Sequence, residues 1–552
     1  MQKDNKKESF GSNHRAESVP LTSTDEMGIS KYSFKLEDAI AKSNYGMFNY
    51  ILITLSGIIL TSGMLDITSM GMVLPIAQCD LNLSNSHKGF LGSVTYIGVI
   101  LSSHFWGFAA DTKGRKKVLV PALFLSFATA TISSFATSFW FLALMRFLNG
   151  IFICASQSII YAFMGEFHVP KRRAKIMMLA SVVYGIASLM NPISGVVLLN
   201  LVDWSFYIPF LDLQFKTWRI FLIVCTIPNL ISAILLIFLI PESPKYTFSQ
   251  GDEAKTLEIL RDIFRRNTGR SILEYEVKSL IKDEEFNEAN VKASKGFFTF
   301  MWTQTTPLFK HPHLKNTITA CYLQFSILIT INGFWTFFPE IQNKTYLWMA
   351  NHPSNATSTV CEILESFHHR NETVAAIKGL SHCTTHLQID TFINITIISF
   401  LYIVGWTICS FIIDYTGKLL IIVLIMLICG ICSASMMFVN IPNISVYLYV
   451  ILQTAGLNMT IINSSTVELF PTKLRAMAVS ISMMVGRIGS AVGSNFLDLH
   501  WIAFVHTPGY YLAYYYYQVD YSHSQYQTLE REESTKRPLM LSKLKKCKQK
   551  QF

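Results

Sequence analysis

The chain has 552 residues, of which 51% are hydrophobic and 15% are charged, and its formal net charge is +10. A soluble domain usually carries about 25% charged residues, so this composition excludes a water-soluble globular protein for most of the chain. The positive charge does not indicate a nucleic-acid partner, because the basic residues lie in short links between apolar runs and in a Lys-rich tail from Lys536 to Lys550.

Apolar runs long enough to cross a bilayer, which takes roughly 20 helical residues, recur between Asn49 and Phe496. Hydrocarbon offers no partner to backbone polar groups, so these runs are predicted to be helices. A polar tail, residues 1–44, precedes a first bundle, residues 45–240. Its six spans are expected near 49–77, 89–110, 118–136, 139–165, 176–200 and 220–240.

A charged segment, residues 241–315, follows and is expected to link the bundles on the cytoplasmic side. Within it, Glu253 to Arg266 has the apolar spacing of a short amphipathic helix. A second bundle is predicted within residues 316–500, with spans near 316–339, 389–413, 419–440, 445–467 and 476–498. The fold class is therefore all-α, that of a polytopic membrane protein. The positive-inside rule places the basic links and both termini in the cytoplasm.

A polar loop, residues 341–388, separates the first two spans of the second bundle and is expected in the lumen or outside the cell. It holds acceptor sequons for N-glycosylation at Asn343, Asn355 and Asn371. A disulfide between Cys361 and Cys383 is chemically allowed there. The histidines of this loop lack the ligand spacing of a structural zinc site, so no metal is predicted.

The links between spans repeat from one half of the chain to the other. Asp111-Thr-Lys-Gly114-Arg115 is echoed by Asp414-Tyr-Thr-Gly417-Lys418, 303 residues later. Such periodicity is the signature of duplicated structure. A second charged pattern agrees, because the Glu166 and Arg173 pair recurs as Glu468 and Arg475, 302 residues later.

The repeat also predicts where a twelfth span should lie, near residues 522–542. That stretch cannot cross a bilayer, because it contains Glu530, Arg531, Glu532, Glu533, Lys536 and Arg537. The sequence thus predicts two pseudo-symmetric bundles of the six-helix type, with the twelfth helix missing or degenerate. Residues 501–552 are interpreted as a divergent tail.

Several motifs resemble the major facilitator superfamily over roughly residues 45–500. The link Gly107-Phe-Ala-Ala-Asp111-Thr-Lys-Gly114-Arg115-Lys116-Lys117 resembles the superfamily's loop between helices two and three. Four further motifs resemble the sugar and organic-ion branches of the superfamily. They are Arg146 with Gly150, Glu166 to Arg173, Pro241-Glu242-Ser243-Pro244-Lys245-Tyr246, and Glu468-Leu-Phe-Pro471 to Arg475. The stretch from Met72 to Ser84, leading into Lys88-Gly89, is similar to the synaptic vesicle glycoprotein 2 and organic cation transporter group. Synaptic vesicle glycoproteins of that kind have a longer luminal loop and a twelfth helix.

The resemblance implies a carrier in which two bundles rock around a central site. The charged links would then be latches that hold the cytoplasmic face shut in the outward-open state. The latch residues would be Asp111, Gly114, Arg115, Glu166, Arg173, Asp414, Gly417, Glu468 and Arg475. Glu166 is expected to pair with Arg173, and Glu468 with Arg475. The alternative is that these charges fix insertion topology and nothing more.

Ionisable groups inside spans are costly and are functional candidates. Asp66 lies on one helical face with Ser62 and Ser69, and is interpreted as a group that binds a cationic substrate or carries a proton. The alternative is a structural partner for a donor on another helix. Arg146 and Arg487 are the candidate counter-charges, or anion-binding groups if the substrate is acidic. Glycines flank Arg487, so a role in helix packing is an equal alternative for it. Neutral polar candidates for a wet cavity include Tyr184, Tyr322, Gln324, Trp335 and Gln453; each alternatively makes an inter-helix hydrogen bond.

The sequence contains no catalytic constellation and no phosphate-cradling loop of the nucleotide-hydrolase type, so neither an enzyme nor a cofactor is predicted. The favoured hypothesis is a gradient-driven transporter of a small organic solute, with an organic cation as one candidate and a coupling ion as a second partner. Its place would be the plasma membrane or a vesicle membrane. The alternative hypothesis is a non-transporting membrane interaction protein similar to synaptic vesicle glycoprotein 2.

Overall fold

The computed structural model describes residues 33–201, 204–281, 302, 305–352, 357–360, 362–364, 366, 387–436, 438–470 and 474–495. Several predicted features lie outside these ranges: Asn355, Asn371, Cys361, Cys383, His368, His369, His382, His386 and residues 496–552. The side chains of Asp414, Glu468 and Arg475 are also outside the description.

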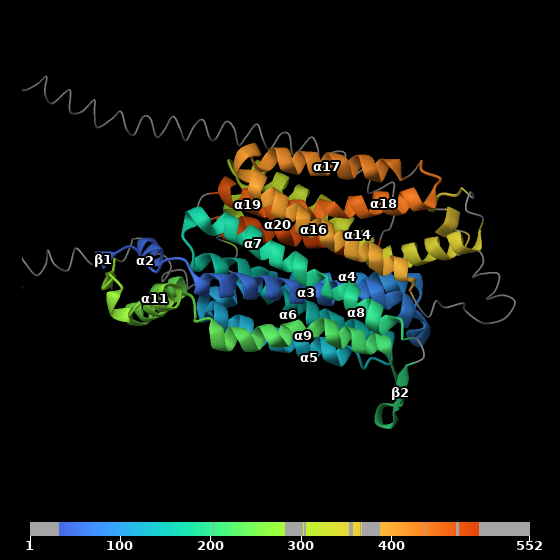
Figure 1. The fold of residues 1–552 in the computed structure, drawn as a ribbon, viewed down its shortest axis with the longest axis horizontal. Helices are drawn as coiled ribbons and strands as arrows, with labels where there is room; N and C mark the ends of the chain where they lie inside the picture. Colours follow the sequence, from blue (N-terminus) through green and yellow to red (C-terminus); the bar gives the residue numbers. More distant parts are fainter. Residues whose placement is uncertain are drawn as a thin grey trace, which may run out of the picture.

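The first bundle consists of long helices that run side by side along one axis (Figure 1). These are α3 (Met47–Leu81), α4 (Asn85–Lys113), α5 (Arg115–Ser133), α6 (Phe139–Glu166), α7 (Pro170–Ser188), α8 (Met190–Leu199) and α9 (Thr217–Leu239). One predicted span is therefore divided, because α7 ends at Ser188 and α8 begins at Met190. Between α8 and α9 the strands β2 (Ser205–Ile208) and β3 (Leu213–Lys216) form an antiparallel hairpin around the 3-10 turn Pro209–Leu211.

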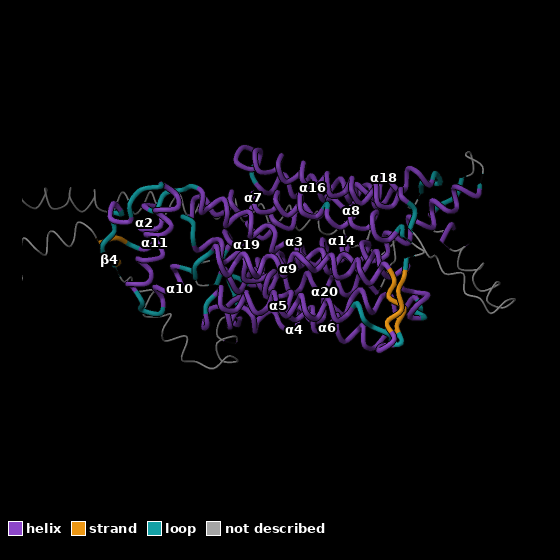
Figure 2. The backbone as a smooth tube through the Cα atoms, turned by 60° about the horizontal axis from the view of Figure 1, so that its bottom comes forward, coloured by secondary structure: helices purple, strands orange, loops and turns teal. Residues whose placement is uncertain are grey.

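The second bundle lies beside the first along the same axis, as the tube view also shows (Figure 2). It contains α14 (Leu314–Asn351), α16 (Ile389–Thr416), α17 (Lys418–Ser435), α18 (Pro442–Gln453), α19 (Leu457–Leu469) and α20 (Arg475–Asn495). A 3-10 turn over Thr454–Gly456 joins α18 to α19. The bundles meet where α3 contacts α14, α4 contacts α20, and α7 and α8 contact α16.

Helix α14 continues past the predicted end of its span at residue 339, so the first part of the expected loop is helical. Membrane helices tolerate an internal proline, here Pro339, and the added turns are held by hydrogen bonds from Asn394 of α16 to Gln342 and Tyr346. This corrects the prediction for Asn343. Its side chain is 2% exposed and accepts a hydrogen bond from the backbone of Gln388, so it is not presented as a loop acceptor for glycosylation.

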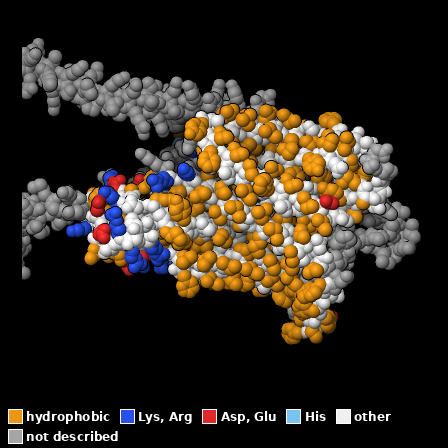
Figure 3. Space-filling model, viewed as in Figure 1, with side chains coloured by type: hydrophobic (Ala, Val, Ile, Leu, Met, Phe, Trp, Pro, Cys, Tyr) orange, Lys and Arg blue, Asp and Glu red, His pale blue; other side chains and the backbone are white. Residues whose placement is uncertain are grey.

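Ten of the described helical segments are long and apolar enough to cross a membrane. Their hydrophobic side chains cover the visible flank of the molecule, whereas Lys, Arg, Asp and Glu gather at one end (Figure 3). This end, here named the basic end, holds α2 (Leu36–Lys42), α10 (Pro244–Ser249) and α11 (Glu253–Thr268), which Figure 2 labels together. The other end, which holds the β2–β3 hairpin, is named the distal end.

The elements at the basic end pack around a small core of their own, which includes Ile40, Leu260, Phe264 and Tyr275. Strands β1 (Ser33–Phe34) and β4 (Ser279–Leu280) pair there in parallel, and 3-10 turns lie at Ile272–Glu274 and, before α14, at Thr306–Phe309. The predicted amphipathic segment from Glu253 is α11. Asn267 of α11 donates hydrogen bonds to Asn49 of α3 and to the backbone of Asn44. The segment after the first bundle is thereby bonded to that bundle.

The repeated glycines have the same conformation in the two halves. Gly114 joins α4 to α5 with φ +105°, and Gly417 joins α16 to α17 with φ +76°. Residues with a side chain rarely adopt such positive φ values, whereas glycine does so freely. The repeat found in the sequence thus corresponds to a repeated corner in the fold.

Helices α4 and α6 cross at glycines, so their backbones approach closely. A Cβ atom on Gly150 would lie 2.1 Å from the carbonyl oxygen of Thr95, and one on Gly98 would lie 2.3 Å from that of Phe147. Packing between membrane helices depends on such small residues because lipid and side chains are equally apolar.

We predict that Gly150→Ala lowers the stability of the protein, because the helices have to separate to admit the methyl group. Overpacking of this kind costs about 1–3 kcal/mol. Thermal unfolding in detergent measures it. Gly107→Ala on α4 is the matched control, since a Cβ there meets nothing within 4 Å. Equal melting temperatures for the two variants would contradict the prediction.

Candidate solute cavity and charge pairs

A cavity lies between the two bundles, and its deep part is neutral. Its walls combine aromatic rings, namely Tyr161, Tyr184, Trp335, Tyr402 and Trp406, with amide side chains, namely Gln157, Asn191 and Asn332. Among its described lining residues there is no charged side chain. Aromatic faces and neutral hydrogen-bonding groups are typical of a pocket for a small organic molecule.

The part of the cavity toward the basic end is positively charged. It shares Gln157, Tyr161 and Thr460 with the deep part, so the two parts adjoin. Lys175, Lys418 and Arg487 line it, and the described lining residues include no Asp or Glu. Lys418 donates a hydrogen bond of 2.8 Å to Ser464. A solute entering from the basic end would therefore meet cations first.

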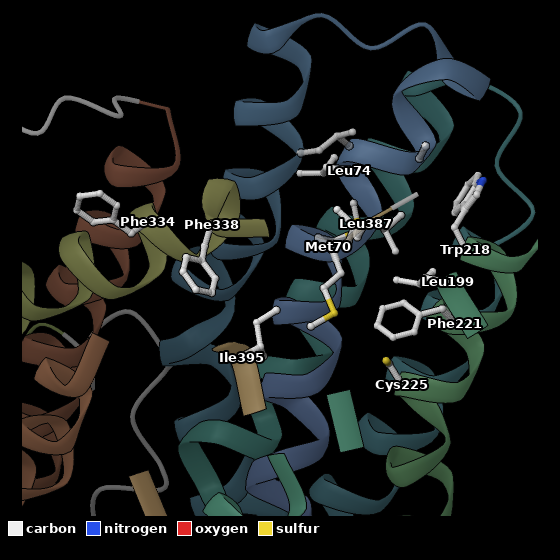
Figure 4. Close-up of a cluster of buried hydrophobic side chains, with 14 of the residues drawn as sticks. Met70, Leu74, Leu199, Trp218, Phe221, Cys225, Phe334, Phe338, Leu387 and Ile395 are labelled. Carbon is white, nitrogen blue, oxygen red and sulfur yellow. The ribbon is translucent and has the colours of Figure 1, made fainter. Parts of the chain in front are cut away.

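Apolar side chains close the cavity at the distal end. One cluster joins Met70 and Leu74 of α3 to Phe334 and Phe338 of α14 and to Ile395 of α16 (Figure 4). The indole of Trp335 also donates to the backbone carbonyl of Thr68 at 3.3 Å. Both bundles contribute to this closure, so it has to separate before a solute could leave on the distal side.

A buried ion pair reinforces the distal closure. Lys88 at the start of α4 is 1% exposed, and its Nζ lies 2.6 Å from the carboxylate of Glu340 on α14. The other carboxylate oxygen of Glu340 binds Lys344 at 2.8 Å. Lys88 also donates to Gln78 at 3.3 Å. Sequence reasoning missed this pair, because the loop was expected to begin next to Glu340.

Asp66 does not line the cavity but faces the interior of the first bundle, as its stripe with Ser62 and Ser69 predicts. Its carboxylate lies 2.7 Å from Nη1 of Arg146, and both side chains are 0% exposed. Asn149 also donates to the carboxylate, and in turn accepts a hydrogen bond from Ser126 of α5. The prediction that Asp66 binds a cationic solute directly is therefore corrected, because donors of α6 already occupy its carboxylate.

Arg487 is the predicted intramembrane charge that does reach the cavity. It is 9% exposed, and its nearest hydrogen-bond contact is the thiol of Cys154 at 3.8 Å. No carboxylate among the described residues lies within 4.0 Å of it. Two predicted neutral residues, Tyr184 and Trp335, also line the cavity.

Three other predicted residues are not among the lining. Gln324 is fully buried and donates to Asn463 of α19 at 2.6 Å, so it joins two helices of one bundle. Gln453 is 2% exposed, and its backbone carbonyl accepts from Tyr402. Tyr322 lies on α14, away from both parts of the cavity.

The predicted latch residues of the first bundle bind one another within that bundle rather than across the bundles. Arg115 contacts Asp111 at 2.8 Å and Glu166 at 3.0 Å. Glu242 accepts hydrogen bonds from the backbone of Lys116 and Lys117 at the start of α5, where an acidic group stabilises the helix. Sequence reasoning quoted this glutamate as part of a motif but missed its role.

The predicted pairing of Glu166 with Arg173 is wrong. Arg173 donates to the backbone carbonyls of Gly165 and His168, at 3.0 and 3.1 Å, and its guanidinium lies 3.5 Å from Glu37. The reason is that α6 ends at Glu166, and the last carbonyls of a helix need donors. Arg173 meets that need and leaves Glu166 to Arg115.

His168, which lies between α6 and α7, belongs to the same corner. Its Nδ1 contacts the carbonyl of Met164 at 2.8 Å, and its Nε2 contacts Asn49 at 2.9 Å. Burial lowers the pKa of the imidazole, and Arg173 adds to the effect. The neutral form is therefore favoured, with Nδ1 donating and Nε2 accepting.

Solved structures with the same fold include the xylose transporter XylE. A partially occluded inward-open form of XylE from E. coli has a TM-score of 0.57 and 15% identity, over 86% of this chain and 99% of that one. XylE described as a proton:xylose symporter bound to 6-bromo-6-deoxy-D-glucose has a TM-score of 0.55 and 15% identity, over 87% and 96%.

Curated relatives are synaptic vesicle glycoproteins 2. Protein 2C of Rattus norvegicus is 26% identical over 318 residues, which cover 55% of this chain and 44% of the relative. Protein 2B of Mus musculus is 25% identical over 346 residues, 58% of this chain and 50% of the relative. The chain thus spans about half the length of these relatives. The sequence model of the Major Facilitator Superfamily matches residues 55–356. With its all-helical, two-bundle fold, the chain belongs to the major facilitator superfamily, and the resemblance read from its motifs is confirmed.

Proposed function

We propose that this protein is a secondary active transporter that moves a small organic solute by alternating access of its two bundles. The observation that carries the proposal is the cavity between the bundles, whose deep part adjoins a cation-lined part toward the basic end and is bordered at the distal end by the apolar cluster. By the positive-inside rule the basic end faces the cytoplasm. In that orientation the cation-lined part of the cavity lies on the cytoplasmic side.

The solute is neutral or anionic rather than cationic. A carboxylate in the cavity would offset the lost hydration of an organic cation. The described lining contains none, since Asp66 is paired with Arg146, whereas Lys175, Lys418 and Arg487 face the route from the basic end. The aromatic and amide walls of the deep part suit the organic body of the solute.

The Asp66–Arg146 pair is the proposed coupling element. Protonation of the carboxyl would remove the charge that compensates Arg146, whose Nε and Nη2 have no hydrogen-bond partner among the described residues. A guanidinium in that position gains strongly from any new acceptor. Because the pair joins α3 to α6 close to the cavity wall, a proton can in this way bias the arrangement of the first bundle.

We predict that Arg487→Gln lowers the uptake of anionic solutes into proteoliposomes by roughly 10- to 100-fold, the worth of one charge-assisted hydrogen bond. Uptake is measured over a panel of labelled anions, sugars and cations. Arg172→Gln is the control, because this exposed cation lies over the ring of Tyr45, outside the cavity.

Saturable uptake confined to cations would refute the proposed solute class. A protein that moves no solute, but that co-purifies stoichiometrically with a partner protein, would instead support the interaction role suggested by the similarity to synaptic vesicle glycoprotein 2.

We predict that Asp66→Asn abolishes accumulation driven by a proton gradient but retains solute exchange at equal pH, because asparagine cannot carry the proton. Uncompensated Arg146 would also destabilise the protein by about 3–5 kcal/mol. The double variant Asp66→Asn/Arg146→Gln should recover the stability without the accumulation. Normal accumulation by Asp66→Asn would show that the pair is structural only.

We predict that Glu340→Gln weakens the distal closure. Lys88 would lose its carboxylate partner, which should destabilise the closed arrangement by about 1–3 kcal/mol. This value lies between the losses measured for exposed ion pairs and for fully buried ones. Hydrogen–deuterium exchange should rise at the start of α4 and in the last turns of α14. Lys344→Met is the control, because it removes a partner of the same carboxylate within one helix. Equal exchange in both variants would argue against a gate.

A further inference from the structure

The β2–β3 hairpin is an amphipathic element at the distal end. Facing residues of an antiparallel pair share one side of the sheet. Phe206 pairs with Phe215 and Ile208 with Leu213, which gives an apolar face. Ser205 pairs with Lys216 and Tyr207 with Gln214, which gives a polar face. Between Trp204 and Lys216 the sequence has two charged residues, Asp212 and Lys216.

The apolar face is buried against the bundle at its base and exposed at the tip of the hairpin. Phe215 is 3% exposed, and its ring packs 5.2 Å from that of Phe135, just after α5. Phe206 stacks on Phe215 at 5.1 Å, yet is 46% exposed, and Trp204 packs against Phe206. At the tip, Phe210 is 94% exposed. The aromatic surface is thus continuous with the flank of the helical bundle.

The hairpin extends sideways, across the direction of the helices. In Figure 1 it projects beyond the outline of the bundle at the distal end, and in Figure 3 its surface is largely hydrophobic. If the helices cross a bilayer, a sideways projection at their ends runs along the surface of that bilayer. Aromatic side chains concentrate at this depth in membrane proteins, because their rings suit the headgroup region.

The two charges of the hairpin do not oppose such a position. Asp212 accepts a hydrogen bond of 2.5 Å from Tyr207 on the polar face. Lys216, at the base, lies 2.5 Å from Asp80 at the end of α3, and Trp218 donates to the same carboxylate at 2.8 Å. These bonds also fix the base of the hairpin to the first bundle, so it does not swing independently.

We infer that the β2–β3 hairpin is a membrane-surface anchor, whose aromatic edge of Trp204, Phe206 and Phe210 inserts into the phospholipid headgroup region of the distal leaflet. Its polar face remains in water. The insertion resembles that of an interfacial amphipathic helix, which sinks roughly 5–10 Å into the boundary between headgroups and acyl chains. The contact holds the first bundle at a fixed depth on the distal side.

The test adds a tryptophan to the full chain in phosphatidylcholine nanodiscs, where both membrane surfaces are accessible. Phe210→Trp places it at the tip, and Gln214→Trp, the matched control, places it on the polar face. The emission of the parent, with its nine tryptophans, is subtracted. We expect the added emission of Phe210→Trp to be quenched by lipids brominated on their acyl chains and shielded from aqueous iodide. Gln214→Trp should show the reverse.

Two outcomes would overturn the inference. Quenching of Phe210→Trp by iodide but not by brominated lipid would mean that the hairpin stands in water. Protection of this tryptophan from both quenchers would mean that protein, either a second copy or another chain, covers the tip. Because Phe210 is almost fully exposed, the substitution does not disturb the packed core, and all outcomes are readable without transport activity.

Discussion

The constraint on which this structure depends is that a charge inside a membrane protein needs an opposite charge, backbone acceptors or a polar cavity. Asp66 and Arg146 satisfy this requirement within the first bundle, and so does Arg115 with its two carboxylates. Such pairs join the helices of the first bundle to one another. Lys88 and Glu340 instead satisfy each other across the bundles, so their pairing depends on how the bundles are arranged. Arg487 satisfies the requirement through the cavity itself.

Most of the fold could be predicted from the sequence, because hydrophobic length and the repeated links determine it directly. The corners at Gly114 and Gly417 lie at the predicted positions, and the family resemblance is confirmed by the comparisons. The end of α14 could not be placed, since Pro339 and Glu340 have the local features of a helix end. Contacts with α16 outweigh those features, and contacts between helices are not visible in local sequence.

The site was less predictable for a related reason. Asp66 was correctly placed on an inward-facing side of its helix. However, such a side can face either the core of its own bundle or the cavity that the two bundles share. Spacing along one helix does not distinguish them, because the choice depends on the rotation of α3 relative to α6. The ion-pair partners could not be read from the sequence either. Glu166 and Arg173 recur at a fixed spacing in both halves, yet Arg173 donates to a backbone carbonyl at the end of α6 instead of pairing with Glu166.

The interrupted helix between Gln453 and Leu457 bears on which solutes the deep pocket can admit. The hydroxyl of Tyr402 donates to the carbonyl of Gln453, and a Cβ atom on Gly456 would lie 2.3 Å from that hydroxyl. The phenol ring is therefore fixed to the main chain and does not turn aside as a free side chain would. A larger guest molecule would have to displace helical backbone, so size discrimination at this wall should be sharp even among compounds of equal polarity.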